Sequence, residues 1–312
     1  MMATNSERVD RACLVCGGNR FQYRFTPRQS PGPVMACRDC GFTFIPTIVN
    51  DKAIISDGPV LDTLPEAARQ SRNLADIQGS WELPILQVKE REFPAARLNT
   101  RQAIRRLASL THPGRILDYG CGGGFQLSVA CEEGWQAEGL EPLTGHAVYA
   151  RAKFGIPVVN DILRDDTFAD ESFDAITAFQ VFEHIPNPVR EIKRLVKALK
   201  PGGALLIEVP NIDNLLSKIM RSRHRHFVAD HLNFFSPATL SRLMRNCGLD
   251  VVSVHFPARM MSIEHLTDWI VRMAPVAKPL ERIGHNPRVA NRMVSVNLHD
   301  IVEVIGIKPP VQ

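Results

Sequence analysis

Residues 116–124 read Ile-Leu-Asp-Tyr-Gly-Cys-Gly-Gly-Gly, so four glycines fall within five positions directly after a short apolar strand pattern and an aspartate. Glycine loses more backbone freedom on folding than any other residue, and such a concentration needs a reason. A glycine-rich turn between a buried strand and the following helix lets a ligand lie against bare main chain. The stretch therefore predicts a ligand-binding loop at the end of a strand.

Short apolar runs alternate with helical patterns after this loop. We expect strands at 115–118, 136–140, 158–160, 173–179 and 204–209, with helices at 125–133, 144–154 and 188–199. Strands joined by helices pair in parallel and carry helices on both faces of the sheet. The pattern predicts a doubly wound, Rossmann-like α/β sheet that binds its ligand at the carboxyl ends of the strands. The polar residues at those ends are Asp118, Glu141, Asp161 and Gln180.

A helical pattern also precedes the loop. Between Pro84 and Leu110, apolar residues recur mostly at three- and four-residue steps. A proline inside a helix removes one backbone hydrogen bond, so we expect a break at Pro94 between helices that pack on the sheet.

The composition of the glycine loop separates two kinds of ligand. A dinucleotide loop reads G-x-G-x-x-G, whereas Gly120 to Gly124 reads G-x-G-G-G, with Asp118 two residues before the first glycine. A carboxylate at that position would repel a pyrophosphate. A cationic ligand without phosphate, such as S-adenosylmethionine, fits better, because Asp118 can organise its ammonium end directly or through water.

Five motifs in order resemble those of the class I S-adenosylmethionine-dependent methyltransferases, over about residues 116–209. They are LDYGCGGG, GLEPL, the acid after the third strand, SFDAITAFQVFEHIPNP and LKPGGALLIEVPN. The resemblance implies a seven-stranded sheet, with DHLNFFSPATLSRLMRNCGLDVV reaching strand six and HDIVEVIGIKP forming an antiparallel strand seven. It also implies that Glu141 binds the ribose hydroxyls, and that Asp161 and Ile162 bind adenine. The full predicted cofactor set is Asp118, Gly120, Cys121, Gly122, Glu141, Pro142, Asp161, Ile162 and Gln180.

Four of the seven cysteines form two matched pairs near the start of the chain. Cys13 and Cys16, like Cys37 and Cys40, are separated by two residues and followed by glycine, and 21–25 alternates like a strand between the pairs. The spacing lets two thiolates of a pair face one ion, and the glycine turn frees N–H groups to bond sulfur. Disulfides and a redox pair are the alternatives, which a reducing cytoplasm and two matched knuckles argue against. We predict a structural Zn²⁺ ion.

The chain divides into a zinc ribbon at 1–45, a linker at 46–82 with one short helix near 65–74, and a methyltransferase domain at 83–312. A segment at about 256–298 is additional to the resemblance and carries six Lys/Arg against three Asp/Glu. We expect it to be a helical insert. It could serve as an active-site lid, a dimer surface, a membrane-facing element or a helical cover for the sheet.

Two histidines are candidates for a general base. Methyl transfer to a hydroxyl needs such a base, and histidine is suited to the role because its pKa lies near neutral pH. His184 follows the fourth strand beside the expected methyl position, and ordering that loop by hydrogen bonds is its alternative role. His231 is the better candidate by sequence, because Asp230 and Asn233 flank it in the part that matches the family.

The stretch RSRHRHFVADHLNFF indicates an acidic acceptor, because arginine guanidinium groups bind carboxylate or phosphate through two parallel hydrogen bonds. Arg223, Arg225 and His226 are predicted to bind a phosphorylated, nucleotide-linked or carboxylated acceptor. A solvated basic loop is the alternative.

Composition bounds the function. The 312 residues carry a formal charge of +4 with 22% charged residues, without the clustered basic face that would indicate a nucleic-acid partner. No apolar run reaches membrane-spanning length and the first residues lack the apolar segment of a secretion signal, so we expect a cytoplasmic protein without a transmembrane segment.

The acceptor follows from resemblances alone. LDYGCGGG and EHIPNP resemble the quinone-pathway O-methyltransferases, whereas a zinc ribbon ahead of this fold is similar to sugar C-methyltransferases and to an RNA guanine methyltransferase group. We predict O-methylation of a small molecule or glycan precursor in specialised or cell-surface metabolism. An RNA base methyltransferase and a non-catalytic binding protein of the same fold are the alternatives, and the oligomeric state stays open.

Overall fold

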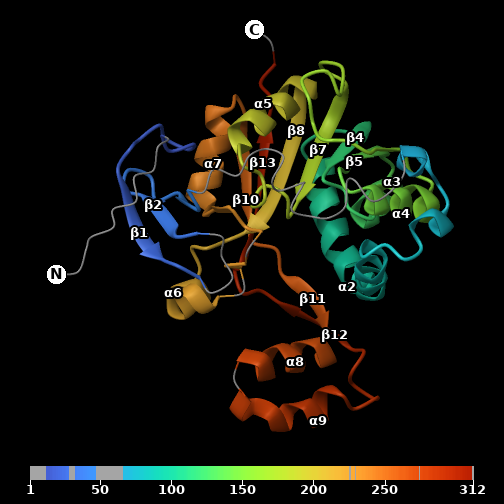
Figure 1. The fold of residues 1–312 in the computed structure, drawn as a ribbon, viewed down its shortest axis with the longest axis vertical. Helices are drawn as coiled ribbons and strands as arrows, with labels where there is room; N and C mark the ends of the chain where they lie inside the picture. The colour runs from blue at the N-terminus through green and yellow to red at the C-terminus, as the bar shows by residue number, and fades with distance from the viewer. Residues whose placement is uncertain are drawn as a thin grey trace.

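A seven-stranded sheet forms the centre of the protein (Figure 1), in a computed structural model that describes residues 12–27, 32–46, 66–224, 226–228, 230–273 and 275–310. Its strand order is β10-β13-β8-β7-β4-β5-β6. The bounds are β4 Arg115–Tyr119, β5 Gln136–Leu140, β6 Val158–Val159, β7 Phe173–Phe179, β8 Leu199–Pro210, β10 Asp250–His255 and β13 Ile301–Ile307.

Strand directions confirm the predicted sheet. Strands β6, β5, β4, β7 and β8 pair in parallel, and β13 lies antiparallel between β8 and β10, with Ile301 opposite Pro210. All strands except β13 therefore end at the same edge. The loops that follow β4, β5, β6 and β7 gather there, which is where an open α/β sheet binds its ligand.

Two cores cover the two faces of the sheet. Ile116 and Leu206 contribute to one core and their neighbours Leu117 and Ile207 to the other, because successive side chains of a strand point to opposite faces. The first core is covered by α2, α3 and α4, and the second by α5 and α7. These helices are α2 Glu82–Ala108, α3 Phe125–Glu132, α4 Thr144–Phe154, α5 Pro188–Ala198 and α7 Pro237–Asn246.

The predicted break at Pro94 is wrong, since α2 continues through it as one 27-residue helix. Proline prevents only the hydrogen bond to the preceding turn, and packing of an apolar face can outweigh that loss. Helix α2 packs against α3, α4 and the later strand β11 (Arg259–Ser262), and its residues Leu86, Ile104 and Leu107 are fully buried.

The cysteine-rich segment forms a second sheet that also includes a strand of the large domain. Its order is β1-β2-β3-β9, and Thr43 of β3 pairs with Phe234 of β9. The Ile45 N–H donates to the Leu232 carbonyl at 2.9 Å just beyond this pair. The ribbon and the large domain thus share a sheet. The bounds are β1 Phe21–Phe25, β2 Val34–Cys37, β3 Thr43–Phe44 and β9 Asn233–Phe234.

The ribbon also shares the core of the large domain. Cys13, Val15 and Phe42 belong to the same buried cluster as Leu240 and Leu243 of α7. The domain boundaries stay predictions, but the packing shows that the ribbon is not an isolated lobe. In Figure 1 the ribbon (blue) lies beside α7.

The segment at 256–298 forms an arm that projects from the lower end of the view in Figure 1. Its base is the antiparallel pair β11 and β12 rather than a helix, so the predicted helical insert also contains a hairpin. The remaining elements are α8 Ile263–Met273, the 3-10 helix η4 Pro275–Leu280, α9 Glu281–Gly284 and β12 Met293–Val296.

Short helices complete the described chain. Residues 47–65 of the predicted linker lie outside the described residues. The short helix expected near 65–74 is found as two 3-10 helices, η1 Glu66–Gln70 and η2 Leu74–Ile77. Helix α6 Leu215–Met220 and η3 Arg221–Arg223 follow β8. Within the described residues, no helix combines the length and the apolar composition that crossing a bilayer requires.

Candidate active site

A cavity of about 860 Å³ opens at the carboxyl edge of the sheet. Its walls come from the glycine loop after β4, the loops after β5, β6 and β7, and the first half of α2. The predicted residues that line it are Gly120, Cys121, Gly122, Glu141, Pro142, Asp161, Ile162, Gln180 and His184. The structure thus brings together residues that are up to 64 positions apart in the chain.

The glycine loop needs glycine for two physical reasons. Gly122 has a φ of +52° and Gly124 a φ of +79°, which other residues rarely adopt. A Cβ at Gly124 would lie 2.7 Å from the Cβ of Ala150, whereas no atom lies within 4 Å of the position of a Cβ at Gly122. Gly122 lines the cavity and has space where a side chain would lie, so a ligand can approach its backbone. Gly124 is instead needed for packing against α4.

Glu141 is a fixed part of the cavity wall. Its Oε2 accepts a hydrogen bond from the Gly122 N–H at 2.8 Å, and its Oε1 accepts one from the Leu143 N–H at 2.9 Å. Burial raises the pKa of this carboxyl, while the two backbone donors favour its ionised form. The remaining lone pairs can accept hydrogen bonds from a ligand's hydroxyl groups.

Asp118 lies behind the glycine loop and does not line the cavity. Its Oδ1 accepts a hydrogen bond from the Thr177 hydroxyl at 2.7 Å, and its side chain is buried. Burial raises its pKa to about 7. The predicted direct contact between Asp118 and a ligand's ammonium group therefore has no support from its position.

Asp161 lines the cavity and already has partners. Its Oδ1 accepts a hydrogen bond from the Ile162 N–H at 2.8 Å, and its Oδ2 pairs with Arg164. The Ile162 N–H is thereby engaged by Asp161 itself, so this part of the wall presents the Asp161 carboxylate as an acceptor for a ligand's amino group.

Gln180 ends β7 in the left-handed region, with a φ of +57°. Its Nε2 donates to Oε1 of Glu208 at 3.0 Å, and burial raises the pKa of Glu208 to about 7. A residue held in this backbone region next to a cavity is a typical feature of functional sites.

His184 lines the cavity with one nitrogen already occupied. Its Nδ1 lies 2.9 Å from the backbone carbonyl oxygen of Asp230. A carbonyl only accepts, so in the neutral ring Nδ1 carries the proton and Nε2 keeps its lone pair. The Nε2 atom can therefore accept a proton from a bound molecule.

His231 lies against His184 and does not line the cavity. The two rings meet edge to face with centroids 4.7 Å apart. Burial and the neighbouring His184 lower the pKa of His231 to about 4. The sequence ranked His231 above His184 as a base, whereas access to the cavity favours His184.

Glu183 completes this group. Its side chain is buried, and within the described residues no group hydrogen-bonds its Oε2. Burial raises its pKa to about 8. Glu183, His184 and His231 each present a potential ligand atom, and these atoms lie within 4.8 Å of one another, so the set could hold a divalent cation.

Of the three predicted acceptor-binding residues, the structure describes the side chain of His226 alone. His226 is buried with its Nε2 3.7 Å from Oδ2 of Asp300, and it does not line the cavity. Arg223 belongs to η3, but its side chain lies outside the described part, and Arg225 lies outside the described residues altogether.

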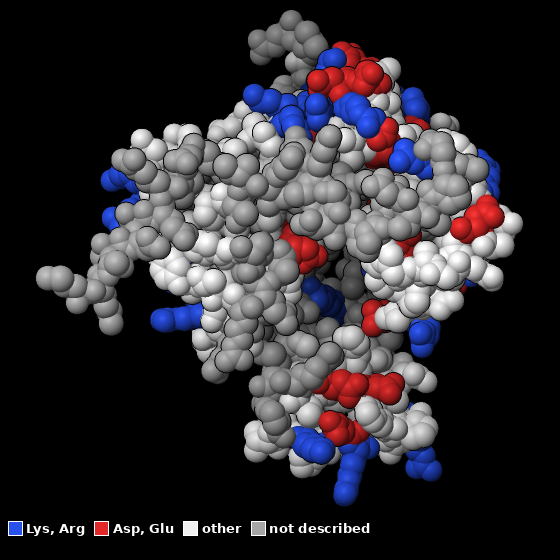
Figure 2. All heavy atoms as spheres, viewed as in Figure 1, with Lys and Arg blue, Asp and Glu red and all other residues white. Residues whose placement is uncertain are grey.

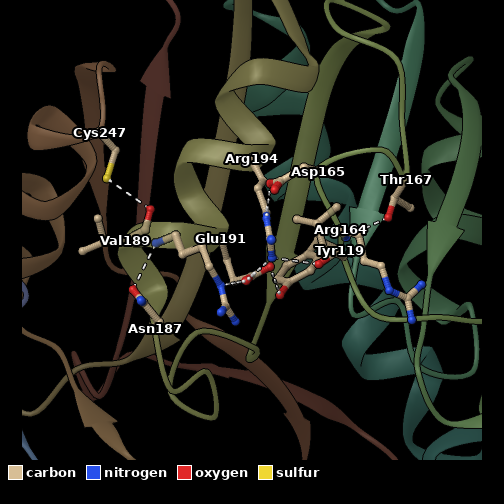
Figure 3. A network of polar contacts seen from close by, with 11 residues as sticks. Tyr119, Arg164, Asp165, Thr167, Asn187, Val189, Glu191, Arg194 and Cys247 are labelled. Atoms are coloured by element: carbon tan, nitrogen blue, oxygen red, sulfur yellow. Dashed lines mark hydrogen bonds and ion pairs between the residues drawn. The ribbon is translucent and has the colours of Figure 1, made fainter. Parts of the chain in front are cut away.

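The cavity contains a polar network on α5 that the sequence analysis missed (Figure 3). The buried Glu191 accepts hydrogen bonds from Tyr119 at 3.3 Å, from Arg194 at 3.1 Å and from Arg190 at 3.0 Å. Arg194 also donates to Asp165 at 2.7 Å. The only signal in the sequence was the spacing of charged residues along one side of an amphipathic helix, which is also typical of a solvated face.

The four predicted metal ligands form one cluster. The sulfur atoms of Cys13 and Cys40 lie 3.6 Å apart, as do those of Cys16 and Cys37. A tetrahedral zinc ion with Zn–S bonds of about 2.3 Å needs sulfur separations of about 3.8 Å. The Gly18 N–H also donates to the Cys16 sulfur at 3.4 Å, as the knuckle pattern predicts, and the cluster fits a zinc ion.

The fold and this cavity define a methyltransferase. Residues 91–254 match a family model described as a methyltransferase domain, and the chain belongs to this family. The class that the sequence motifs resemble is thereby confirmed.

The chain is also similar to individual methyltransferases of known name. Over 158 residues the chain is 29% identical to the ubiquinone biosynthesis O-methyltransferase of Azoarcus sp., covering 45% of this chain and 66% of that protein. Over 218 residues it is 25% identical to the Burkholderia thailandensis protein of the same name, covering 63% and 91%. The chain thus spans slightly less than two thirds of the Azoarcus relative.

Among solved structures, the complex between the Haloferax volcanii Trm112 methyltransferase activator and a methyltransferase contains a chain of similar fold. The TM-score is 0.53 at 19% identity, and the match covers 77% of this chain and 99% of that chain. At this identity the match supports the fold alone.

Proposed function

We propose that this protein transfers a methyl group from S-adenosylmethionine to a hydroxyl oxygen of a small molecule. The observation that carries the proposal is the cavity of about 860 Å³ that is lined by the glycine loop, Glu141, Asp161 and His184. Its volume suits a nucleoside together with a small acceptor.

The chain's own residues fit the nucleoside cofactor. The open side of Gly122 leaves room for a ligand against the main chain, and Glu141 offers oxygens to a ribose diol. Asp161 offers an acceptor for the adenine amino group, and the Ile162 N–H, which donates to Asp161 in this structure, would exchange that partner to donate to adenine. When bound, S-adenosylmethionine supplies an electrophilic methyl group. The role proposed for Asp118 is to hold Thr177 and the base of the glycine loop.

His184 is the proposed general base. Its Nδ1–H donates to the Asp230 carbonyl, which orients the ring and leaves Nε2 to take the proton of the acceptor hydroxyl. Removing that proton raises the nucleophilicity of the oxygen as it approaches the methyl group. Holding both reactants in one cavity supplies much of the remaining rate gain.

A divalent cation is a second way to activate the hydroxyl. The buried, unpartnered Oε2 of Glu183 lies with His184 and His231 in a set that could bind such an ion. A bound cation would polarise the hydroxyl and lower its pKa. Turnover that EDTA abolishes and Mg²⁺ alone restores would support the cation, because Mg²⁺ does not replace zinc in a four-cysteine site. Turnover that is indifferent to EDTA supports the histidine base.

The proposed acceptor carries its hydroxyl on an apolar or aromatic ring. Phe93, Ile185 and Pro186 contribute an apolar wall to the cavity. Such a wall favours a phenol over the glycan precursor expected from sequence, because a sugar exposes polar hydroxyls on every side. The name of the relatives, ubiquinone biosynthesis O-methyltransferase, agrees with this class.

We also propose that Cys13, Cys16, Cys37 and Cys40 bind a zinc ion. Four cysteine ligands leave no open coordination position, so the ion would stabilise the ribbon and take no part in the chemistry. Neither the RNA alternative nor a non-catalytic role receives support from the comparisons.

Titration calorimetry and an acceptor screen test the proposal. We expect S-adenosylmethionine and its demethylated product to bind, and a mass gain of one methyl group on an ortho-dihydroxy phenol but not on a sugar nucleotide. Absence of binding by either nucleoside would overturn the proposed function. Binding together with methylation of the sugar nucleotide alone would overturn the acceptor class.

A further inference from the structure

The arm between β10 and β13 emerges at the same edge of the sheet as the cavity. Strand β10 runs parallel to β8 and ends at His255, and β13 begins at Ile301 opposite the last residue of β8. Everything inserted between these two strands must therefore leave the molecule at the carboxyl edge. Figure 1 shows the arm extending from that edge away from the rest of the protein.

The arm is a built structure with its own internal contacts. The backbone N–H of Ile263 donates to the Arg292 carbonyl at 2.9 Å, which closes the hairpin below α8. Gly284 packs so closely on α8 that a Cβ there would lie 1.7 Å from the Thr267 hydroxyl. His285 pairs with Asp268 at 2.8 Å and ties the end of α9 to α8.

The outer surface of the arm exposes aliphatic side chains. Val276 is 90% exposed and Ile283 is 59% exposed, and Leu280 lies between them along η4 and α9. Val276 and Leu280 belong to the 3-10 helix η4 and Ile283 to α9, so the three aliphatic side chains come from two successive short helices of the arm. Such exposure of aliphatic groups is costly in water unless another surface covers them.

The arm also exposes basic side chains, two of which, Lys278 and Arg282, lie within the same stretch of sequence as these aliphatic groups. Lys278, Arg282, Arg288 and Arg292 are exposed. The arm carries three acidic residues. Asp268 pairs with His285, Glu281 is half-buried and Glu264 is exposed. Figure 2 shows basic side chains projecting from the far end of the arm.

We propose that the arm binds the surface of an anionic phospholipid bilayer. Exposed aliphatic residues flanked by lysine and arginine are the composition of a segment that lies in the lipid headgroup region. Each cation near an anionic surface adds to the attraction. Attachment through the arm would turn the edge that carries the cavity toward the membrane.

A second copy of the chain fits this surface less well. A stable protein interface buries roughly 800 Å² on each partner, more than three aliphatic side chains on a narrow arm provide. The exposed cations of the arm would also repel the same cations of a second copy.

Vesicle sedimentation of the full-length protein tests the proposal. We expect binding to vesicles of phosphatidylcholine with phosphatidylglycerol, and none to phosphatidylcholine alone. The double variants Lys278→Glu with Arg282→Glu and Val276→Ser with Ile283→Ser should each bind at least tenfold more weakly, because they remove attraction and apolar contact respectively.

Two matched controls change the same chemistry elsewhere. Arg242→Glu with Arg245→Glu reverses two exposed charges on α7, and Val252→Ser with Val254→Ser removes two exposed aliphatic groups on β10. Both should bind vesicles like the unaltered protein. All four variants change exposed positions, and unaltered melting temperatures will show that they fold.

Three results would overturn the proposal. The first is no binding of the unaltered protein to anionic vesicles, and the second is an equal or greater loss in the controls than in the arm variants. The third is a concentration-dependent dimer in sedimentation velocity that Val276→Ser with Ile283→Ser abolishes, because the arm would then join two copies. None of these readouts depends on catalysis, so they are independent of the proposed function.

Discussion

The backbone N–H of Gly122 donates to Oε2 of Glu141 at 2.8 Å, so the carboxylate that ends β5 holds the loop that follows β4. The contact joins two loops that the chain separates by 19 residues. It also means that one side chain both shapes the glycine loop and presents oxygen atoms to the cavity.

Glu141→Gln should weaken S-adenosylmethionine binding at least tenfold, which corresponds to about 1.4 kcal/mol. The amide retains one acceptor oxygen but loses the charge and replaces the second acceptor with a donor, which cannot pair with the Gly122 N–H. Titration calorimetry measures the effect. Glu138→Gln, on β5 but half-buried, away from the cavity lining and paired with Arg115, is the control and should bind normally. Equal affinities for all three proteins would contradict the role of Glu141.

His184→Gln should lower kcat by roughly a hundredfold while leaving the Kd for S-adenosylmethionine unchanged, because a general base contributes about that much to the rate. His231→Gln should lower kcat less, since His231 supports the His184 ring from outside the cavity. Steady-state kinetics with a phenolic acceptor measures both. A larger loss of kcat in His231→Gln than in His184→Gln would identify His231, the residue favoured by the sequence, as the general base.

Cys16→Ser should remove the bound zinc and lower the melting temperature by several degrees, because a structural zinc site contributes folding free energy directly. Metal analysis of freshly purified protein should give one zinc per chain before the substitution. Cys131→Ser changes an exposed cysteine on α3 and is the matched control. Zinc that stays bound in Cys16→Ser, or its absence from the unaltered protein, would exclude the four-cysteine site.

Glu82 gives a pH dependence of stability. It is fully buried at the start of α2 beside Gly145, and burial together with the nearby Glu141 raises its pKa to about 7. A carboxyl whose folded pKa is raised stabilises the fold fully below its unfolded pKa near 4.5, and this stabilisation is lost as the pH rises toward 7.

Glu82→Gln should remove that loss. The melting temperature of the variant relative to the unaltered protein should therefore rise between pH 5 and pH 8, by the equivalent of roughly 1–3 kcal/mol. Differential scanning calorimetry across this range measures it. Glu264→Gln, at an exposed position, should show no such trend. A difference that stays constant with pH would mean that Glu82 ionises normally in the fold.

The sheet was predictable because its signals are local. Each strand is a short buried run and each crossover an amphipathic segment, so the sequence predicted strands such as Phe173–Phe179 with their observed bounds. Pro94 misled because the packing of α2 against α3 and β11 is a tertiary effect that a local pattern does not contain. The pairing of β3 with β9 joins residues almost 200 positions apart, and two-residue strands carry no pattern of their own.

The lining of the cavity was predictable where residues lie in the loops that follow parallel strands. Glu141, Asp161 and His184 end at the carboxyl edge by topology alone. Asp118 lies near the end of its strand, as the sequence indicated. Successive side chains of a strand point to opposite faces, however, and Asp118 bonds Thr177 instead of lining the cavity. Glu191 and Arg190 were missed because a charged helix residue looks the same in sequence whether it faces water or a cavity.

Strand β9 begins two residues after His231, and its pairing with β3 continues into the hydrogen bond between Ile45 and Leu232. The four-cysteine ribbon is therefore hydrogen-bonded to the start of the segment that follows Asp230 and His231. If the proposed zinc ion holds the ribbon together, a shortage of zinc would displace Asp230 and with it the proposed base His184 before it disturbed the glycine loop. Turnover would then fall at a smaller loss of zinc than cofactor binding would.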